Sequence, residues 1–269
     1  MGAAAWVADT PLGIAAAIAT GGAMAGCAAS VAGGGSPCRT NGSTAAVTAT
    51  NAGCWDNATM GSGVDKMGLA QSVYHVLIGL QTVPNAIVAS ESGGYDVLPA
   101  NRELAGAEVE LVDIEEREGR LKIALAEVGD RYDFVLIDCP PALSLLTLNG
   151  LCAANGVIVP MQCEYFALEG LSDLVNTIKQ VHANLNPDLT IIGLLRVMFD
   201  PRTTLQQQVS DQLVSHFGDK VFNTVIPRNV RLAEAPSYGM PGVAFDKASR
   251  GAQSYMQFGA EMIDRIKTM

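Results

Sequence analysis

Residues 132–141 read Tyr-Asp-Phe-Val-Leu-Ile-Asp-Cys-Pro-Pro, and they give the strongest indication of how this chain folds. Four successive apolar residues, Phe134 to Ile137, are followed directly by an acid. An unbroken apolar run is typical of a strand that is buried on both faces, as in a parallel sheet. Because proline cannot donate a backbone hydrogen bond, the two prolines should end this strand.

Strands and helices alternate on both sides of this segment. Short apolar runs predict further strands at residues 95–99, 156–160, 189–198 and 221–226. Apolar residues at helical spacing predict helices over residues 104–114, 115–128, 168–181, 205–217 and 252–266. The alternation predicts an α/β fold with a mostly parallel, twisted sheet that helices cover on both faces.

The composition is that of a protein with one sizeable core. The chain has 269 residues, and 49% of them are hydrophobic. No apolar stretch approaches the roughly 18 residues that a membrane span needs. None of the six cysteines belongs to a C-x-x-C pair, and a disulfide scaffold is not expected in so long and apolar a chain. We therefore expect reduced thiols and a cytoplasmic protein.

Charge is distributed unevenly along the chain, whose formal net charge is −10. Residues 57–195 contain 7 Lys/Arg and 18 Asp/Glu, a net charge of 7 − 18 = −11. Residues 196–269 contain 9 Lys/Arg and 7 Asp/Glu, a net charge of 9 − 7 = +2. The overall charge argues against wholesale wrapping of nucleic acid, so we expect any contact with a polyanion to come from the C-terminal quarter.

Residues 1–56 differ from the rest. They contain 17 Ala, 10 Gly and 9 Ser/Thr, together 36 of 56, and sustain no period of 2 or 3.6 residues. One interpretation is a lipoprotein-type signal, which residues 24–27 (Met-Ala-Gly-Cys) loosely resemble, although no Lys or Arg precedes them as such a signal requires. Another is a flexible leader. We favour a frame error, recombination scar or artificial replacement, and expect an aberrant, disordered or out-of-frame segment at 1–56 and one domain at 57–269.

From residue 57 onward the chain carries long motifs of a known kind in the expected order. They are NATMGSGVDK (57–66), YDVLPANRELAGAEVEL (95–111), YDFVLIDCPPALSLLTLNGL (132–151), PMQCEYFALEGLSDLVNTI (160–178), GLLRVMFDPRTTLQQQV (193–209) and VIPRNVRLAEAPSYGMPGVAFDKASRGAQSY (225–255). Over about 210 of its 269 residues the sequence resembles the ParA/Soj partitioning ATPases of the MinD/ParA superfamily. The resemblance implies a P-loop NTPase-like fold of the deviant Walker A class.

The resemblance fails at the N-terminus. The family opens with a strand and a deviant Walker A loop, K-G-G-V-G-K-T-T, followed by a second strand that ends in D-x-D-P-Q-G-N. Here only the tail of the second motif remains, at residues 57–60. No lysine in the chain follows a glycine, so no P-loop is present elsewhere in it. We therefore expect degenerate N-terminal strands and a sheet that has lost two central strands, with an exposed edge.

The resemblance also implies nucleotide-site residues. Asp138 matches the Walker B acid, which holds Mg²⁺ in the family; the alternative is an acid that caps a loop after a strand. Pro227 and Asn229 match the loop that lies against adenine; the alternative is a turn capped by asparagine. We read Cys139 as a small buried filler.

Two arginines match family positions that contact the DNA backbone, Arg202 and Arg231. A planar guanidinium pairs with phosphate oxygens bidentately, and the resulting binding is independent of sequence and weakened by salt. The alternative for each is a solvated surface arginine.

The resemblance implies ATP and Mg²⁺ as cofactors, a homodimer, non-specific DNA and a ParB-type protein as partners, no membrane attachment, and association with the nucleoid. Without the phosphate-binding loop, we expect this chain to be defective in ATP binding and hydrolysis, with no intact catalytic residues. The alternative function is that of a non-enzymatic DNA-binding or regulatory remnant.

Overall fold

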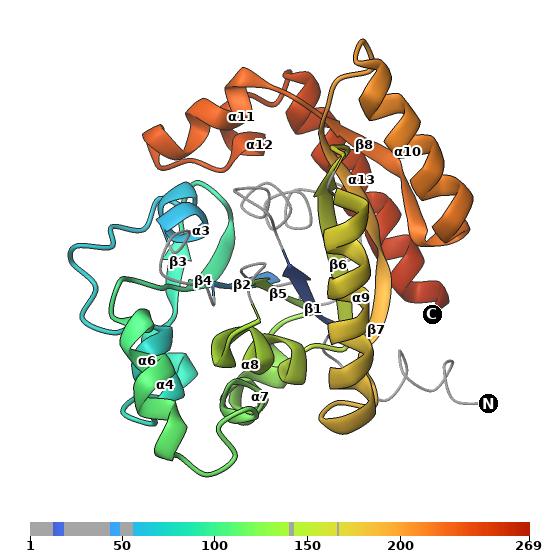
Figure 1. Ribbon diagram of the computed structural model, residues 1–269. Coiled ribbons are helices and arrows are strands. Elements are labelled where there is room, and N and C mark those ends of the chain that lie inside the picture. Colours follow the sequence, from blue (N-terminus) through green and yellow to red (C-terminus); the bar gives the residue numbers. More distant parts are fainter. Residues whose placement is uncertain (1–12, 19–43, 49–55, 140–142, 166) are drawn as a thin grey trace.

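The computed structural model describes residues 13–18, 44–48, 56–139, 143–165 and 167–269 (Figure 1). Within them, eight strands form one sheet in the order β3-β4-β2-β5-β1-β6-β7-β8. Neighbouring strands are parallel except for the antiparallel pair β3 and β4. Their bounds are β1 Gly13–Ile18, β2 Thr44–Thr48, β3 Val88–Ser90, β4 Tyr95–Leu98, β5 Phe134–Cys139, β6 Gly156–Gln162, β7 Thr190–Phe199 and β8 Val221–Pro227.

The strand predicted from the apolar run is confirmed as β5, with parallel partners on both sides. Its side chains alternate between two cores. Val135 and Ile137 belong to one hydrophobic cluster, and Leu136 belongs to the other, on the opposite face of the sheet. A strand that is buried on both faces needs apolar residues at every position, which explains the unbroken run in the sequence.

Helices cover both faces of the sheet, as predicted. The first cluster includes buried side chains from α4 (Val73–Leu77), α7 (Arg120–Leu125), α8 (Leu145–Ala153), α9 (Ala167–Asn184) and α10 (Thr204–Phe217). The second is built mainly against α13 (Arg250–Thr268). Shorter helices are α3 (Asp56–Gly61), α5 (Val83–Ala86), α6 (Leu104–Glu110), α11 (Val230–Glu234) and α12 (Gly242–Phe245), with 3-10 turns η1 (Leu111–Asp113), η2 (Ala126–Arg131), η3 (Gly218–Lys220) and η4 (Ala235–Tyr238).

The helix expected over residues 115–128 is shorter than its charged sequence indicated. Glu116 has a φ of 53°, a left-handed conformation that interrupts a helix, and α7 begins only at Arg120. The 3-10 turn η2 then takes over from Ala126. The helix expected over 104–114 likewise tightens into η1 after Glu110.

The expectation of a sheet without two central strands is wrong. β1 runs beside β5 from Gly13↔Phe134 to Ile18↔Cys139, and β2 lies on the other side of β5. Both strands come from the segment 1–56, where the sequence showed no strand period. Ladder hydrogen bonds use backbone groups alone, so a run of small residues can pair without an alternating pattern. The division of the chain at residue 57 stays a prediction.

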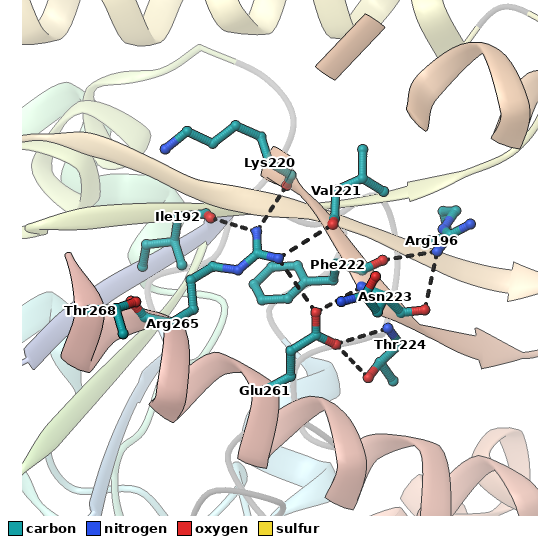
Figure 2. A network of polar contacts seen from close by, with 10 residues as sticks. All are labelled: Ile192, Arg196, Lys220, Val221, Phe222, Asn223, Thr224, Glu261, Arg265 and Thr268. Atoms are coloured by element: carbon teal, nitrogen blue, oxygen red, sulfur yellow. Dashed lines mark hydrogen bonds and ion pairs between the residues drawn. The ribbon is translucent and has the colours of Figure 1, made fainter. Parts of the chain in front are cut away.

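The edge strand β8 is irregular and is held by charged side chains (Figure 2). Between two points of its register with β7, Leu194↔Val221 and Arg196↔Val225, β8 contains two more residues than its neighbour. Arg196 donates to the carbonyl oxygens of Phe222 and Asn223 at 2.9 and 3.2 Å. These bonds satisfy backbone oxygens that the interrupted ladder leaves over.

Helix α13 also bonds to the irregular part of β8. Glu261 accepts hydrogen bonds from the backbone nitrogens of Asn223 (2.7 Å) and Thr224 (2.9 Å), and from the Thr224 hydroxyl (2.6 Å). One turn later, Arg265 donates to the backbone oxygens of strand β7 and of residues 220–221, and its guanidinium lies 4.1 Å from the centroid of the Phe222 ring. Glu261 and Arg265 together, here called the polar clasp, hold strand β8 (Figure 2). Strand β8 ends at Pro227.

Candidate functional site

The parallel strands all end at one edge of the sheet, here called the carboxyl edge. In open α/β sheets, ligands bind in the crevice outside this edge. Asp138 is the last residue but one of β5, and its backbone is in register with Ala17 of β1 and Thr48 of β2. The acid therefore stands at the centre of the carboxyl edge, as the sequence predicted for a strand-end carboxylate.

Burial sets the electrostatics of Asp138. The side chain is only partly accessible, and loss of water raises the pKa of its carboxyl to about 7. No hydrogen bond or ion pair joins it to Pro227, Asn229, Arg202 or Arg231 within the part of the chain that the structure describes. Among the described residues, no positively charged side chain therefore stabilises the ionised carboxylate. A cation beside Asp138 would lower the pKa of its carboxyl again.

One carboxylate is a poor magnesium site by itself. No group of three or more His, Cys, Asp or Glu side chains that could hold a metal occurs among the described residues. Mg²⁺ in nucleotide sites completes its octahedron with phosphate oxygens and waters, so Asp138 could serve it only beside a bound phosphate. A P-loop cradle would follow β1, where residues 19–43 lie outside the described residues; their sequence contains no lysine. Residues 19–43 therefore lack the lysine that a P-loop uses to hold phosphate.

The loop after β8 has a firm structural role. Pro227 is the last residue of β8 and is in register with Phe199 of β7, and the Arg228 nitrogen donates to the Phe199 oxygen at 3.3 Å. Asn229 caps helix α11, because its Oδ1 accepts from the Leu232 nitrogen at 3.3 Å. This is the capped turn that the sequence left open as the alternative. Contact of Pro227 and Asn229 with adenine stays a prediction.

Arg202 lies on the loop after β7, at the carboxyl edge, with 88% of its side chain exposed. Its Nε and Nη2 donate to the two carboxylate oxygens of Asp200 at 2.9 and 2.7 Å. These bonds lower the pKa of Asp200 to about 2, and the nearby Arg228 contributes to the same shift. The structure thus brings Arg202, Arg228 and Asp200 together where β7 and β8 end.

Arg231 lies on α11, at the same edge of the sheet, and is also exposed. Its Nη1 contacts Glu234 Oε2 at 3.0 Å, and its Nε lies 3.7 Å from Asp246 Oδ2. Both predicted arginines are therefore on the surface but engaged by carboxylates of their own chain. Asp200 could have been found from its two-residue spacing to Arg202, since aspartate commonly accepts from the backbone two residues on. Asp246 is too far along the chain for such a signal.

A close contact across the carboxyl edge could not be found from the sequence. Gly63, just after α3, and Gly239, just after η4, both have positive φ angles, +77° and +62°. A Cβ on Gly63 would lie 2.7 Å from the Gly239 oxygen. On the other side of α3, the Thr59 hydroxyl donates to the Ala100 oxygen and accepts from its nitrogen. Helix α3 thus contacts the segment after β4 through Thr59, and the loop that follows it contacts the segment after η4 through Gly63.

Solved structures have the same architecture. A cobyrinic acid a,c-diamide synthase from Mycobacterium smegmatis, with bound ATP analog and magnesium, is 33% identical, with a TM-score of 0.78 over 96% of each chain. The cell division ATPase MinD of Pyrococcus furiosus is 21% identical, with a TM-score of 0.72 over 94% of this chain and 98% of that one, a likeness of fold alone. Together with the sheet order and the acid at the end of a central strand, these matches define an α/β protein of the P-loop NTPase type.

Sequence relatives narrow this class to a family. A family model described as an AAA domain matches residues 47–191. The sporulation initiation inhibitor protein Soj of Bacillus subtilis is 50% identical over 206 residues, which are 77% of this chain and 81% of that protein. The chromosome partitioning protein ParA of Caulobacter vibrioides is 44% identical over 211 residues, 78% of this chain and 79% of that protein. The chain belongs to the ParA/Soj family of chromosome-partitioning ATPases.

Proposed function

We propose that this chain is a DNA-partitioning protein that keeps the family's DNA-facing surface but neither binds ATP tightly nor hydrolyses it. The observation that carries the proposal is the absence of a Gly-Lys pair anywhere in its 269 residues. In a P-loop, backbone N–H groups and the loop lysine hold the β- and γ-phosphates, and phosphoryl transfer depends almost wholly on such positioning and charge neutralisation. Losing the loop removes affinity and catalysis together.

The residues that remain suit contact with DNA backbone. Arg202 and Arg231 are both exposed at the carboxyl edge, and a guanidinium can hold two phosphate oxygens at once. The C-terminal quarter that carries them has a net charge of +2, against −11 for residues 57–195. Binding of this kind is independent of sequence and falls steeply with salt.

The partners that we propose for this chain are those of the ParA/Soj family. A ParB-type partner, nucleoid DNA and a nucleotide-dependent homodimer are what the family implies. Because the nucleotide step is the one that this chain lacks, we propose that its DNA binding is not gated by ATP. In the described residues, no helix combines the length and apolar character that crossing a bilayer would require.

The test is to measure DNA binding and ATP hydrolysis on the same preparation. Fluorescence anisotropy with a labelled random-sequence duplex should show salt-sensitive binding that Mg²⁺ and ATP leave unchanged, and phosphate release should stay at the background rate with DNA present. Asp138→Asn serves as the matched control for contaminating ATPases. Hydrolysis that DNA stimulates and that Asp138→Asn abolishes would overturn the proposal.

A second candidate is a regulatory remnant that binds DNA without taking part in partitioning. The ion-paired state of both arginines favours it, because their charge is already partly compensated. The two candidates differ in the partner. A ParB-type protein should bind this chain and alter its release from DNA if it acts in partitioning, and should have no effect on a remnant.

A further inference from the structure

Each arginine assigned to DNA is contacted by an aspartate that has two separate tasks. One carboxylate oxygen of the aspartate accepts backbone hydrogen bonds of its own loop. The carboxylate also faces a guanidinium. The pattern occurs twice on different loops, at Asp200 and at Asp246.

The first instance lies directly after β7. Asp200 Oδ1 accepts from the backbone nitrogen of Arg202 at 3.0 Å, which forms a tight turn. The same carboxylate receives Nε and Nη2 of Arg202, so it occupies two donors of the fork that would clasp a phosphate. Three quarters of the Asp200 side chain is buried, while the Arg202 side chain is 88% exposed. The Asp200 side chain is therefore largely packed within its own loop, whereas the Arg202 side chain lies on the surface and contacts it from outside.

The second instance lies just before α13. Asp246 Oδ1 accepts from the backbone nitrogens of Ala248 and Ser249 at 3.1 and 3.2 Å. Its other oxygen, Oδ2, faces Nε of Arg231 at 3.7 Å. Glu234 adds a second carboxylate to the same guanidinium, at 3.0 Å. In both instances an asparagine would keep one oxygen for the turn, while its amide nitrogen would replace the oxygen that faces the guanidinium. The substitution therefore removes the ion pair together with the negative charge.

Competition between these carboxylates and DNA follows from their chemistry. A carboxylate and a phosphate present the same pair of anionic oxygens to an arginine. Both arginines are open to solvent, where water and salt screen their ion pairs, so a phosphate that offers the same two oxygens can replace the carboxylate. Until it does, the aspartate cancels the charge that attracts DNA. Asp200 stays ionised at any physiological pH, because the Arg202 bonds hold the pKa of its carboxyl near 2.

We propose that Asp200 and Asp246 are intramolecular competitors of DNA phosphate, which mask Arg202 and Arg231 and so set the DNA affinity of the chain. The proposal rests on the proposed function, in that it requires the two arginines to contact DNA. DNA binding exchanges each aspartate for a phosphate group. Neutralising the aspartates therefore strengthens DNA binding.

The test compares the DNA affinity of Asp200→Asn, Asp246→Asn and the double variant with that of the unaltered chain. At low salt Asp200→Asn should bind a random-sequence duplex about two- to fivefold more tightly. Asp246→Asn should gain less, because Glu234 still contacts Arg231 at 3.0 Å. The plot of log affinity against log salt should become steeper by up to about one unit for each aspartate removed. The gain should therefore disappear between about 50 and about 200 mM salt.

The control is Asp188→Asn, which makes the same charge change on an exposed residue just before β7, at the opposite edge of the sheet. It should leave the affinity unchanged, and an equal gain there would overturn the masking proposal in favour of net charge. If Arg202→Ala weakens binding while Asp200→Asn and Asp246→Asn do not strengthen it, masking is wrong and the DNA surface stands. If Arg202→Ala and Arg231→Ala both leave binding unchanged, the assigned DNA surface and the masking proposal fail together.

Discussion

Asp138 is a residue whose position follows from the sequence and whose electrostatic state does not. Its place at the end of a buried strand follows from the sequence, because an apolar run followed by an acid and two prolines marks a strand end in a parallel sheet. Its electrostatic state does not follow from the sequence. Only the structure shows a carboxyl whose pKa burial raises to about 7.

Neutralising Asp138 should stabilise the ligand-free chain in a pH-dependent way. The unfolded carboxyl ionises near pH 4 and the folded one near pH 7, so the unfolded state loses its proton first and stability falls as the pH rises through that interval. Asp138→Asn removes this effect. We expect a gain of about 1–3 kcal/mol at pH 8 and a smaller one at pH 5, measured by urea unfolding. A loss of stability at pH 8 would contradict the raised pKa, because it would mean that folding stabilises the ionised carboxylate.

The ion pairs of Arg202 and Arg231 differ in how far the sequence predicts them. Asp200 stands two residues before Arg202 in the sequence, so their contact is a local one. The approach of Asp246 to Arg231 depends on how α11, η4 and α12 fold back before α13 begins. Such contacts are set by tertiary packing, which local pattern does not encode.

At the scale of elements, α13 does more than cover the sheet. Glu261 supplies the acceptor for two backbone N–H groups and one hydroxyl of β8, at the point where the ladder with β7 is interrupted. The helix was predicted from its apolar spacing, and its apolar residues do pack in the second core cluster. The hydrogen bonds of Glu261 to β8 were not predictable, because they compensate a shift in the register of β8 with β7 that the sequence of β8 does not reveal.

Removing that acceptor should destabilise the protein more than an ordinary surface change. Glu261→Ala removes the acceptor of two backbone donors of β8, one exposed and one half-buried, so we expect a cost of about 1 kcal/mol. Glu261→Gln keeps one oxygen and should cost less. Asp264→Asn, an exposed acid on the same helix, should be nearly neutral. Thermal unfolding followed by circular dichroism measures all three. Equal stability of Glu261→Ala and the unaltered chain would show that the clasp is dispensable.

The contact between the segments after α3 and η4 can be tested with a matched pair of glycines. Gly63→Ala places a Cβ 2.7 Å from the Gly239 oxygen and strains a φ of +77°, whereas Gly94→Ala meets no atom within 4 Å at a φ of +71°. Backbone strain is therefore similar, and the clash differs. We expect Gly63→Ala to lose about 1–2 kcal/mol more than Gly94→Ala in chemical unfolding. Equal losses would mean that the two segments separate easily.

At the scale of the whole molecule, the order of elements from residue 95 onward was predictable and the centre of the sheet was not. Apolar runs predicted the strands of that region, and apolar residues at helical spacing predicted its helices. Both patterns arise because a regular element buries side chains at regular intervals. β1 and β2 lie in an Ala- and Gly-rich segment without period, and they are nonetheless the neighbours of β5. Backbone hydrogen bonding therefore puts β1 and β2 at the centre of the sheet, a position that the pattern of their side chains did not predict.

ATP binding decides whether this chain combines the family's fold with a site that no longer holds ATP phosphates. Isothermal titration of ATP with Mg²⁺ should be run on the chain and on a chimera in which the matching N-terminal segment of Bacillus subtilis Soj replaces residues 1–56. We expect no binding by the chain up to about 1 mM, the upper end of usual Michaelis constants, and clear binding by the chimera. Saturable binding by the unaltered chain that Asp138→Asn removes would contradict it.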